Sequence, residues 1–127
     1  MRIRVEAEVY PTESEEKVIQ AVKNLFPTID FKVLIQGAME IVVGECSGLE
    51  CLENLKNMLK NRRIRSAARN ILKQSKVDSK LVFYMNKQAA YVGQASFTEP
   101  FTESPLPPIR VEIEAEDVDK IIEWLTE

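Results

Sequence analysis

Two segments near the ends of the chain alternate strictly between apolar and polar residues, and this alternation constrains the fold most. In segment 2–10 the odd-numbered residues are apolar and residues 2, 4, 6 and 8 are charged. Segment 109–115 repeats the pattern, with Ile109, Val111 and Ile113 on its apolar side. Such strands have one buried face and one face in water. A sheet built from them needs helices on one face only, which predicts a two-layer α/β sandwich.

Between these strands, apolar spacing and turn residues predict the other elements. Thr12–Glu15 and Ser47–Glu50 have the spacing of capping boxes, and each is expected to start a helix. Further strands are expected at 30–36, 39–46, 80–86 and 94–98, with Gly37-Ala38 forming a hairpin turn. The helical spacing of apolar residues is interrupted near Asn61, so we expect two helices to meet or one helix to bend there. Segment 87–91 is too short for a full helix, and a last helix is expected at 116–126.

The expected order is therefore β-α-β-β-α-α-β-β-β-α. It predicts an α+β fold with a mixed, mostly antiparallel sheet of about six strands and helices on one face. A chain of 127 residues is expected to form a single domain, 1–127. No apolar run approaches the roughly 18 residues that a membrane span needs, and the N-terminal segment is not a signal peptide. We therefore expect a cytoplasmic protein without a membrane partner.

Charge is distributed unevenly along the chain. Net charge is −3, but the segment Lys56–Lys76 contains eight basic residues among 21 and no acidic residue. On a helix, Arg62, Arg65, Arg69, Lys73 and Lys76 fall within a wedge of roughly 80°. The apolar residues of the segment, Ile64, Ala67, Ala68, Ile71 and Leu72, fall on the opposite side. The pattern predicts a helix with one buried face and one basic face in water.

Three interpretations of this basic face remain open: a polyanion-binding surface, a solvated face or partner of the molecule's own acids, and a docking surface for another protein. Arg65–Arg69 and Arg69–Lys73 are like-charged pairs at i,i+4, which destabilise a helix by roughly 0.2–0.5 kcal/mol each. A chain that keeps them is expected to use their field. Arginine also binds phosphate in a bidentate manner, which favours a nucleic acid.

Most catalytic and cofactor chemistry is missing from the sequence. There is no histidine, which removes the commonest general base and metal ligand. The four glycines never cluster into a phosphate-binding loop. Cys46 and Cys51 are expected to be reduced packing residues, Cys46 at a strand end and Cys51 in the next helix. The acidic group around 112–117 is expected to be a solvated strand face and a helix start. We expect no enzyme, no catalytic residue, no metal and no cofactor.

Lys87-Gln88-Ala89-Ala90 and Glu103-Ser104-Pro105-Leu106 give the chain a recognisable resemblance. With Pro11-Thr12-Glu13, Arg63-Ile64, 67–69 and Trp124-Leu125, it resembles an uncharacterised, conserved archaeal family related to predicted exosome subunits. Pro107 stands where the family's turn has glycine. The resemblance covers essentially the whole chain. It implies an α/β fold like that of the ribosomal protein that contacts five-S RNA, and RNA binding without an assigned activity.

We therefore predict an RNA-binding protein of weak sequence specificity that contacts the phosphate backbone through its basic helix. The alternative is a protein-interaction or homo-oligomerising module, such as a homodimer, whose basic helix docks on an acidic surface. Lys87 and Gln88 are candidates for a second RNA contact, or else Gln88 caps a turn and Lys87 is exposed. The predicted RNA-binding residues are Arg62, Arg63, Arg65, Arg69, Lys73, Lys76, Lys87 and Gln88.

Overall fold

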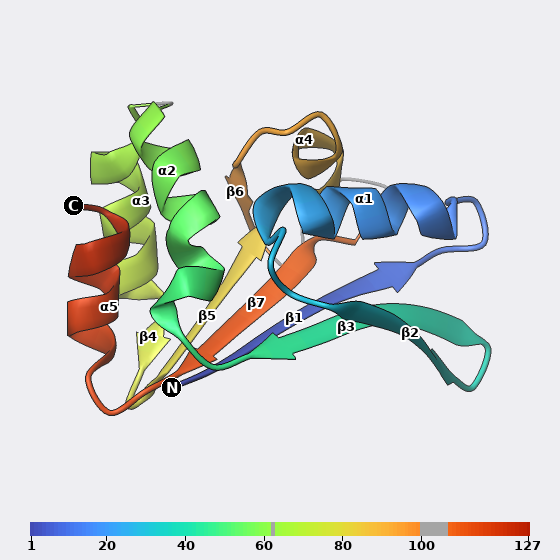
Figure 1. Ribbon diagram of the computed structural model, residues 1–127, viewed down its shortest axis with the longest axis horizontal. Helices are drawn as coiled ribbons and strands as arrows, with labels where there is room; N and C mark the ends of the chain where they lie inside the picture. Colours follow the sequence, from blue (N-terminus) through green and yellow to red (C-terminus); the bar gives the residue numbers. More distant parts are fainter. Residues whose placement is uncertain (62, 100–106) are drawn as a thin grey trace.

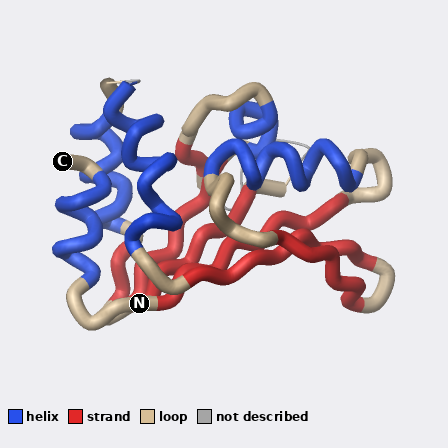
Figure 2. Tube along the Cα trace, in the orientation of Figure 1, coloured by secondary structure: helices blue, strands red, loops and turns tan. Residues whose placement is uncertain are grey.

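The computed structural model describes residues 1–61, 63–99 and 107–127. Its helices lie on one side of a twisted antiparallel sheet (Figure 1), and the separation into a helical layer and a sheet layer is plain in Figure 2. The predicted two-layer α/β sandwich is confirmed. No helix in the described part of the chain is both long enough and apolar enough to span a bilayer.

Within the described residues, seven strands form the sheet in the order β2-β3-β1-β7-β5-β4, with β6 also paired to β5. All pairs among the described strands are antiparallel. The strands are β1 (Arg2–Val9), β2 (Phe31–Gln36), β3 (Met39–Cys46), β4 (Lys76–Val77), β5 (Lys80–Met85), β6 (Phe97–Thr98) and β7 (Ile109–Glu114). The two alternating segments of the sequence, β1 and β7, are thus neighbours at the centre of the sheet.

The helical layer has two groups, which Figure 1 shows over different ends of the sheet. One group is α1 (Glu15–Leu25) with the short α4 (Lys87–Tyr91). The other contains α2 (Glu53–Asn61), α3 (Arg65–Gln74) and α5 (Val118–Leu125), preceded by the 3₁₀ turn η1 (Leu49–Leu52). The predicted break near Asn61 is confirmed, because α2 ends there and α3 begins four residues later.

Burial follows the predicted alternation. Ile3, Val5, Val111 and Ile113 are fully buried between the sheet and the helices, and the charged residues of the same strands face away from the helices.

Asparagine side chains join the helices: Asn24 donates to the carbonyls of Ala90 and Tyr91 at the end of α4. The helical layer is therefore tied together by polar contacts as well as by its core.

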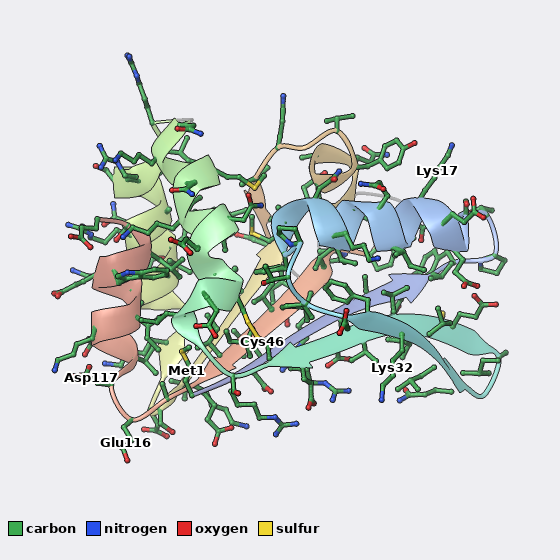
Figure 3. All side chains as sticks on the ribbon, in the orientation of Figure 1. Met1, Lys17, Lys32, Cys46, Glu116 and Asp117 are labelled. Carbon is green, nitrogen blue, oxygen red and sulfur yellow. A yellow bond between two sulfur atoms is a disulfide. The ribbon has the colours of Figure 1, made fainter. Side chains whose placement is uncertain are left out.

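Both predicted capping boxes are wrong. Helix α1 starts after Ser14, and η1 starts after Gly48, in each case without a side-chain capping hydrogen bond. The expectation of reduced cysteines is also wrong, because a disulfide joins Cys46 and Cys51 (Figure 3). Their predicted places are confirmed: Cys46 ends β3, and Cys51 lies in the following 3₁₀ turn.

Candidate nucleic-acid interface

The corner between α2 and α3 closes as a Schellman-type helix end. The amide of Arg63 donates to the carbonyl of Lys60 at 3.2 Å, and the amide of Ile64 donates to the carbonyl of Leu59 at 3.4 Å. In this motif the residue after the helix C-cap has a left-handed backbone conformation, and that residue is usually glycine. Here Arg63 occupies it, with φ 57°. The backbone therefore holds an exposed arginine at a position that disfavours side chains.

Arg69 is oriented towards the end of α5 rather than into open solvent. Its Nε donates to Thr126 Oγ1 at 3.0 Å, and its Nη2 donates to the carbonyl of Thr126, also at 3.0 Å. One turn earlier, Arg65 Nη1 donates to the backbone oxygen of Glu127 at 2.9 Å. The last carbonyls of a helix lack partners within it and carry partial negative charge, so cations stabilise them. The like-charged pair Arg65–Arg69 thus forms a cap for α5.

Two lysines of the basic segment also contact α5 or the residues that follow it. Lys76 Nζ forms an ion pair with Asp119 at 2.7 Å. Lys56 Nζ lies 3.4 Å from Glu127 and 4.5 Å from the ring centre of Trp124. The prediction that the whole basic face stands open to water is therefore wrong. Ala68 and Leu72 are the buried residues of α3, and the flank that carries Arg69 faces α5.

Other cations at this corner keep no partner within the described residues. Lys60, Arg63 and Lys73 are exposed and make no ion pair there. Lys60 was missed as a site residue, although its place just before the break at Asn61 could have signalled it. Arg62 was predicted to belong to this surface and lies outside the described residues.

The open face of the sheet carries arginines as well, but its own acids neutralise them. Arg2 and Arg4 both bind Glu45, at 2.8 and 2.7 Å. Arg110 contacts Glu112 at 3.2 Å and Glu6 at 3.4 Å. Bonding to the two arginines lowers the pKa of Glu45 below its usual value and keeps it ionised. This face therefore offers a polyanion less unpaired positive charge than the α2–α3 corner does.

Lys87 lies inside the protein, in contrast to both interpretations of its sequence. It is 5% exposed, and its Nζ donates to the carbonyl of Glu8 at 2.6 Å and to both carboxylate oxygens of Glu13 at 3.0 and 3.1 Å. Burial lowers its pKa, and the bonds to Glu13 oppose that shift. All protons of the ammonium are used within the fold, so Lys87 is unsuited to bind phosphate. Asn86, rather than Gln88, caps α4, and Gln88 is exposed.

The described residues contain no group of three or more histidine, cysteine or acidic side chains that could hold a metal ion. The α2–α3 corner is a patch of exposed cations, Lys60, Arg63 and Lys73. It can bind an anion through charge and hydrogen bonds.

Comparison with known proteins identifies the family of this chain. A family model described as RNA binding matches residues 2–115. A UPF0201 protein from Sulfurisphaera tokodaii is 42% identical over 98% of this chain and 86% of its own length. The chain belongs to the UPF0201 family. A second UPF0201 protein, from Aeropyrum pernix, is 41% identical over 98% of this chain and 84% of its own length.

A solved UPF0201 structure has the same fold. The protein from Methanococcus jannaschii is 32% identical, with a TM-score of 0.88, and the match covers 99% of this chain and 92% of that one. The predicted membership of a conserved archaeal family is therefore confirmed. The relation to exosome subunits and to a ribosomal-protein fold stays a prediction.

Proposed function

We propose that this protein is a non-catalytic, cytoplasmic RNA-binding protein whose α2–α3 corner contacts the phosphate backbone. The cations assigned to this contact are Lys60, Arg63 and Lys73, with Arg65 beside them and Arg62 as a predicted neighbour. The observation that carries the proposal is the exposure of Lys60, Arg63 and Lys73 without an acidic partner among the described residues, on a chain that matches an RNA-binding family model.

The backbone at Arg63 supports the same assignment. A side chain in the left-handed region costs roughly 1–2 kcal/mol, and glycine would avoid that cost. By comparison, Asp78 has φ 56° in the β4–β5 turn, where aspartate is tolerated and can bond to nearby backbone. The long arginine side chain does not offset the cost of the left-handed backbone in this way. Binding of its guanidinium to a ligand outside the protein would explain why arginine occupies this position.

Salt dependence tests this proposal. Each phosphate contact on a single strand changes the slope of log affinity against log salt by about −0.7. We expect the double variant Arg63→Ala/Lys73→Ala to bind single-stranded RNA more weakly and with a slope shallower by about 1.4. The control Lys32→Ala/Lys80→Ala removes the same charge from the open sheet face and should bind almost as the wild type does. Equal losses of RNA affinity in the two double variants would refute the assignment of the α2–α3 corner as the RNA contact.

A second copy of the chain is the alternative partner, since β2 is an edge strand with Leu34 36% and Ile35 74% exposed. Natural proteins usually protect such an edge with charges or proline. Light scattering across a salt series separates the alternatives. A dimer that dissociates at high salt, in a protein without RNA affinity, would favour docking through the basic helix. A dimer that persists at high salt but is lost in Ile35→Lys would favour pairing through β2.

A further inference from the structure

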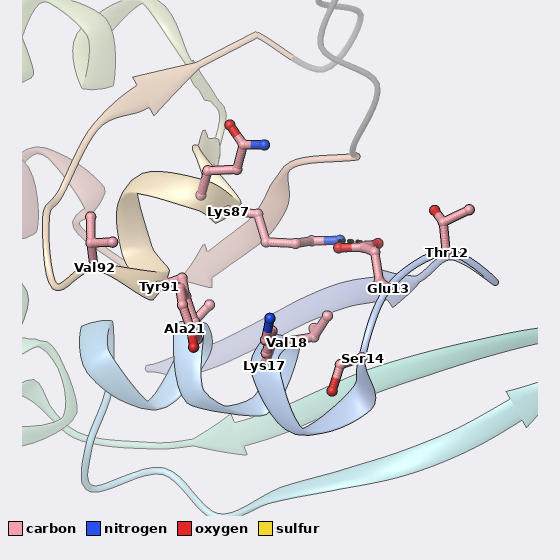
Figure 4. Close-up of a pocket in the computed structure, with 10 residues that line it drawn as sticks. Thr12, Glu13, Ser14, Lys17, Val18, Ala21, Lys87, Tyr91 and Val92 are labelled. Carbon is pink, nitrogen blue, oxygen red and sulfur yellow. Dashed lines mark hydrogen bonds and ion pairs between the residues drawn. The ribbon is translucent and has the colours of Figure 1, made fainter.

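A cavity of about 520 Å³ lies between the start of α1 and α4, away from the α2–α3 corner. It brings together residues 12–18 and 87–92, which are remote in the sequence (Figure 4). Its volume falls within the roughly 300–1,000 Å³ typical of small-ligand sites. Val18 and Ala21 give it an apolar wall, and Thr12 and Ser14 add hydroxyl groups at the rim.

The buried ion pair of Lys87 and Glu13 forms the base of this cavity. Glu13 also accepts a hydrogen bond from the amide of Tyr10, so its carboxylate is satisfied on both sides. Breaking a buried pair by removing one partner is costly, whereas the intact pair holds its neighbours in fixed positions. The pair therefore fixes α4 against the β1–α1 turn and leaves no net charge at the base of the cavity.

Three side chains at the mouth of the cavity make no ion pair and no side-chain hydrogen bond within the described residues. Tyr91 is 43% exposed, and its ring has no aromatic neighbour among the described residues. The Nζ of Lys17 lies 5.9 Å from the centre of that ring and has no ion-pair partner in the described chain. Gln88 is exposed, and within the same residues its amide makes no hydrogen bond. An aromatic ring, an amide without a hydrogen bond and a cation whose one described contact is with that ring thus line one opening.

We propose that this cavity binds a single unstacked nucleotide of RNA. The base stacks on Tyr91, its edge meets the amide of Gln88, and the adjoining phosphate binds Lys17. Single-stranded RNA is recognised in this manner, by stacking bases on aromatic rings and by hydrogen bonds to their edges. The charges of Lys87 and Glu13 cancel, so Lys17 leaves the lining with one positive charge, which favours an anion. The proposal rests on the proposed RNA-binding function and assigns it a second contact.

The cavity is also held in shape before any ligand arrives. Asn24 on α1 donates to the carbonyls of Ala90 and Tyr91 at 2.9 and 3.1 Å, so these bonds tie the end of α4 to α1. Gly93 follows with φ 79°, which turns the chain away immediately after Val92. A preformed site loses less entropy on binding, so a single base can add measurable affinity.

The test compares variants at the mouth with a matched aromatic control. Nucleoside 5′-monophosphates with each of the common bases, and a short single-stranded RNA, are titrated while backbone amides are followed by NMR. We expect shifts at residues 88–93, and Tyr91→Ala should weaken RNA binding by about 5- to 100-fold. Tyr84→Ala, on the open face of the sheet, should not. Gln88→Ala should reduce discrimination between bases and retain most of the affinity.

The outcomes separate this proposal from the function on which it rests. If RNA binds, depends on Arg63 and Lys73, and is unaffected by Tyr91→Ala with no shifts at 88–93, the cavity proposal is overturned and the corner remains. If the Arg63→Ala/Lys73→Ala variant binds RNA as tightly as the wild type, the proposed interface fails whatever the cavity does. Loss of affinity in Tyr91→Ala and Lys17→Ala, with the matched control Lys23→Ala unchanged, supports the nucleotide site.

Discussion

Replacing Arg69 with methionine tests whether the basic segment is partly structural. The substitution keeps an unbranched apolar stem and removes the guanidinium. Two hydrogen bonds to Thr126 are lost, both 3.0 Å long, and the carbonyl of this 3%-exposed residue is left without that donor. Hydrogen bonds from charged donors contribute about 1.5–3 kcal/mol each. Arg69 is half-buried, so water replaces part of the loss.

The substitution also removes repulsion between Arg69 and its charged neighbours, since like pairs one turn apart cost roughly 0.2–0.5 kcal/mol each. This gain offsets a further part of the lost hydrogen-bond energy. The net loss in unfolding free energy is therefore about 2 kcal/mol. For a chain of this length that lowers the melting temperature by about 6–10 °C. Urea unfolding measures it directly, because the single tryptophan, Trp124, lies on α5 and reports the release of this helix.

Lys73→Met is the matched control, one turn along the same helix at an exposed position. It should change stability by less than about 0.5 kcal/mol and weaken RNA binding. Arg69→Met should instead lower stability and leave RNA binding at physiological salt nearly unchanged. Should Arg69→Met unfold like the wild type and bind RNA as weakly as Lys73→Met, the α5 cap would be refuted and Arg69 would return to the RNA-binding surface.

Three further substitutions test other parts of the fold. Arg63→Gly should increase the free energy of unfolding by about 1 kcal/mol, which raises the urea midpoint. RNA titrations of the same variant should show weaker binding. Lys87→Met and Glu13→Gln should each cost about 3–5 kcal/mol in urea unfolding, and strictly additive losses in the double variant would contradict a coupled pair. Gly44→Ala should cost about 1–3 kcal/mol in the same assay, since its Cβ would lie 2.6 Å from a methyl group of Ile29; unchanged stability would show that Ile29 moves aside.

The sheet could be predicted because its information is local. Each residue of β1 and β7 has its face fixed by its position in the alternation, and the turn at Gly37, with φ 64°, places β2 beside β3. The failed capping box at Thr12 has a long-range cause. The neighbouring Glu13 binds the amide of Tyr10 and the ammonium of Lys87, which lies 74 residues away, and helix α1 begins after this contact.

The basic helix shows where periodicity stops being informative. The spacing of Arg65 and Arg69 placed them correctly on one flank of α3, whereas Lys76, which was expected on the same helix, lies in β4. It could not indicate that α5, some fifty residues later, would pack against that flank. A helical wheel gives the faces of a helix, whereas the neighbour that covers each face is a property of the whole fold. The left-handed backbone at Arg63 was equally invisible, since arginine is not a residue that signals it.

Contact with α5 does not cancel the charge of the segment. The described bonds of Arg69 go to the hydroxyl and the carbonyl oxygen of Thr126, which carry no formal charge. Side-chain carboxylates pair only with Lys56 and Lys76 among the described cations of segment 56–76. The segment therefore keeps most of its positive field while part of it holds the fold together. That field attracts a polyanion over about 8 Å at physiological ionic strength, and direct contact falls to the cations left exposed at the corner.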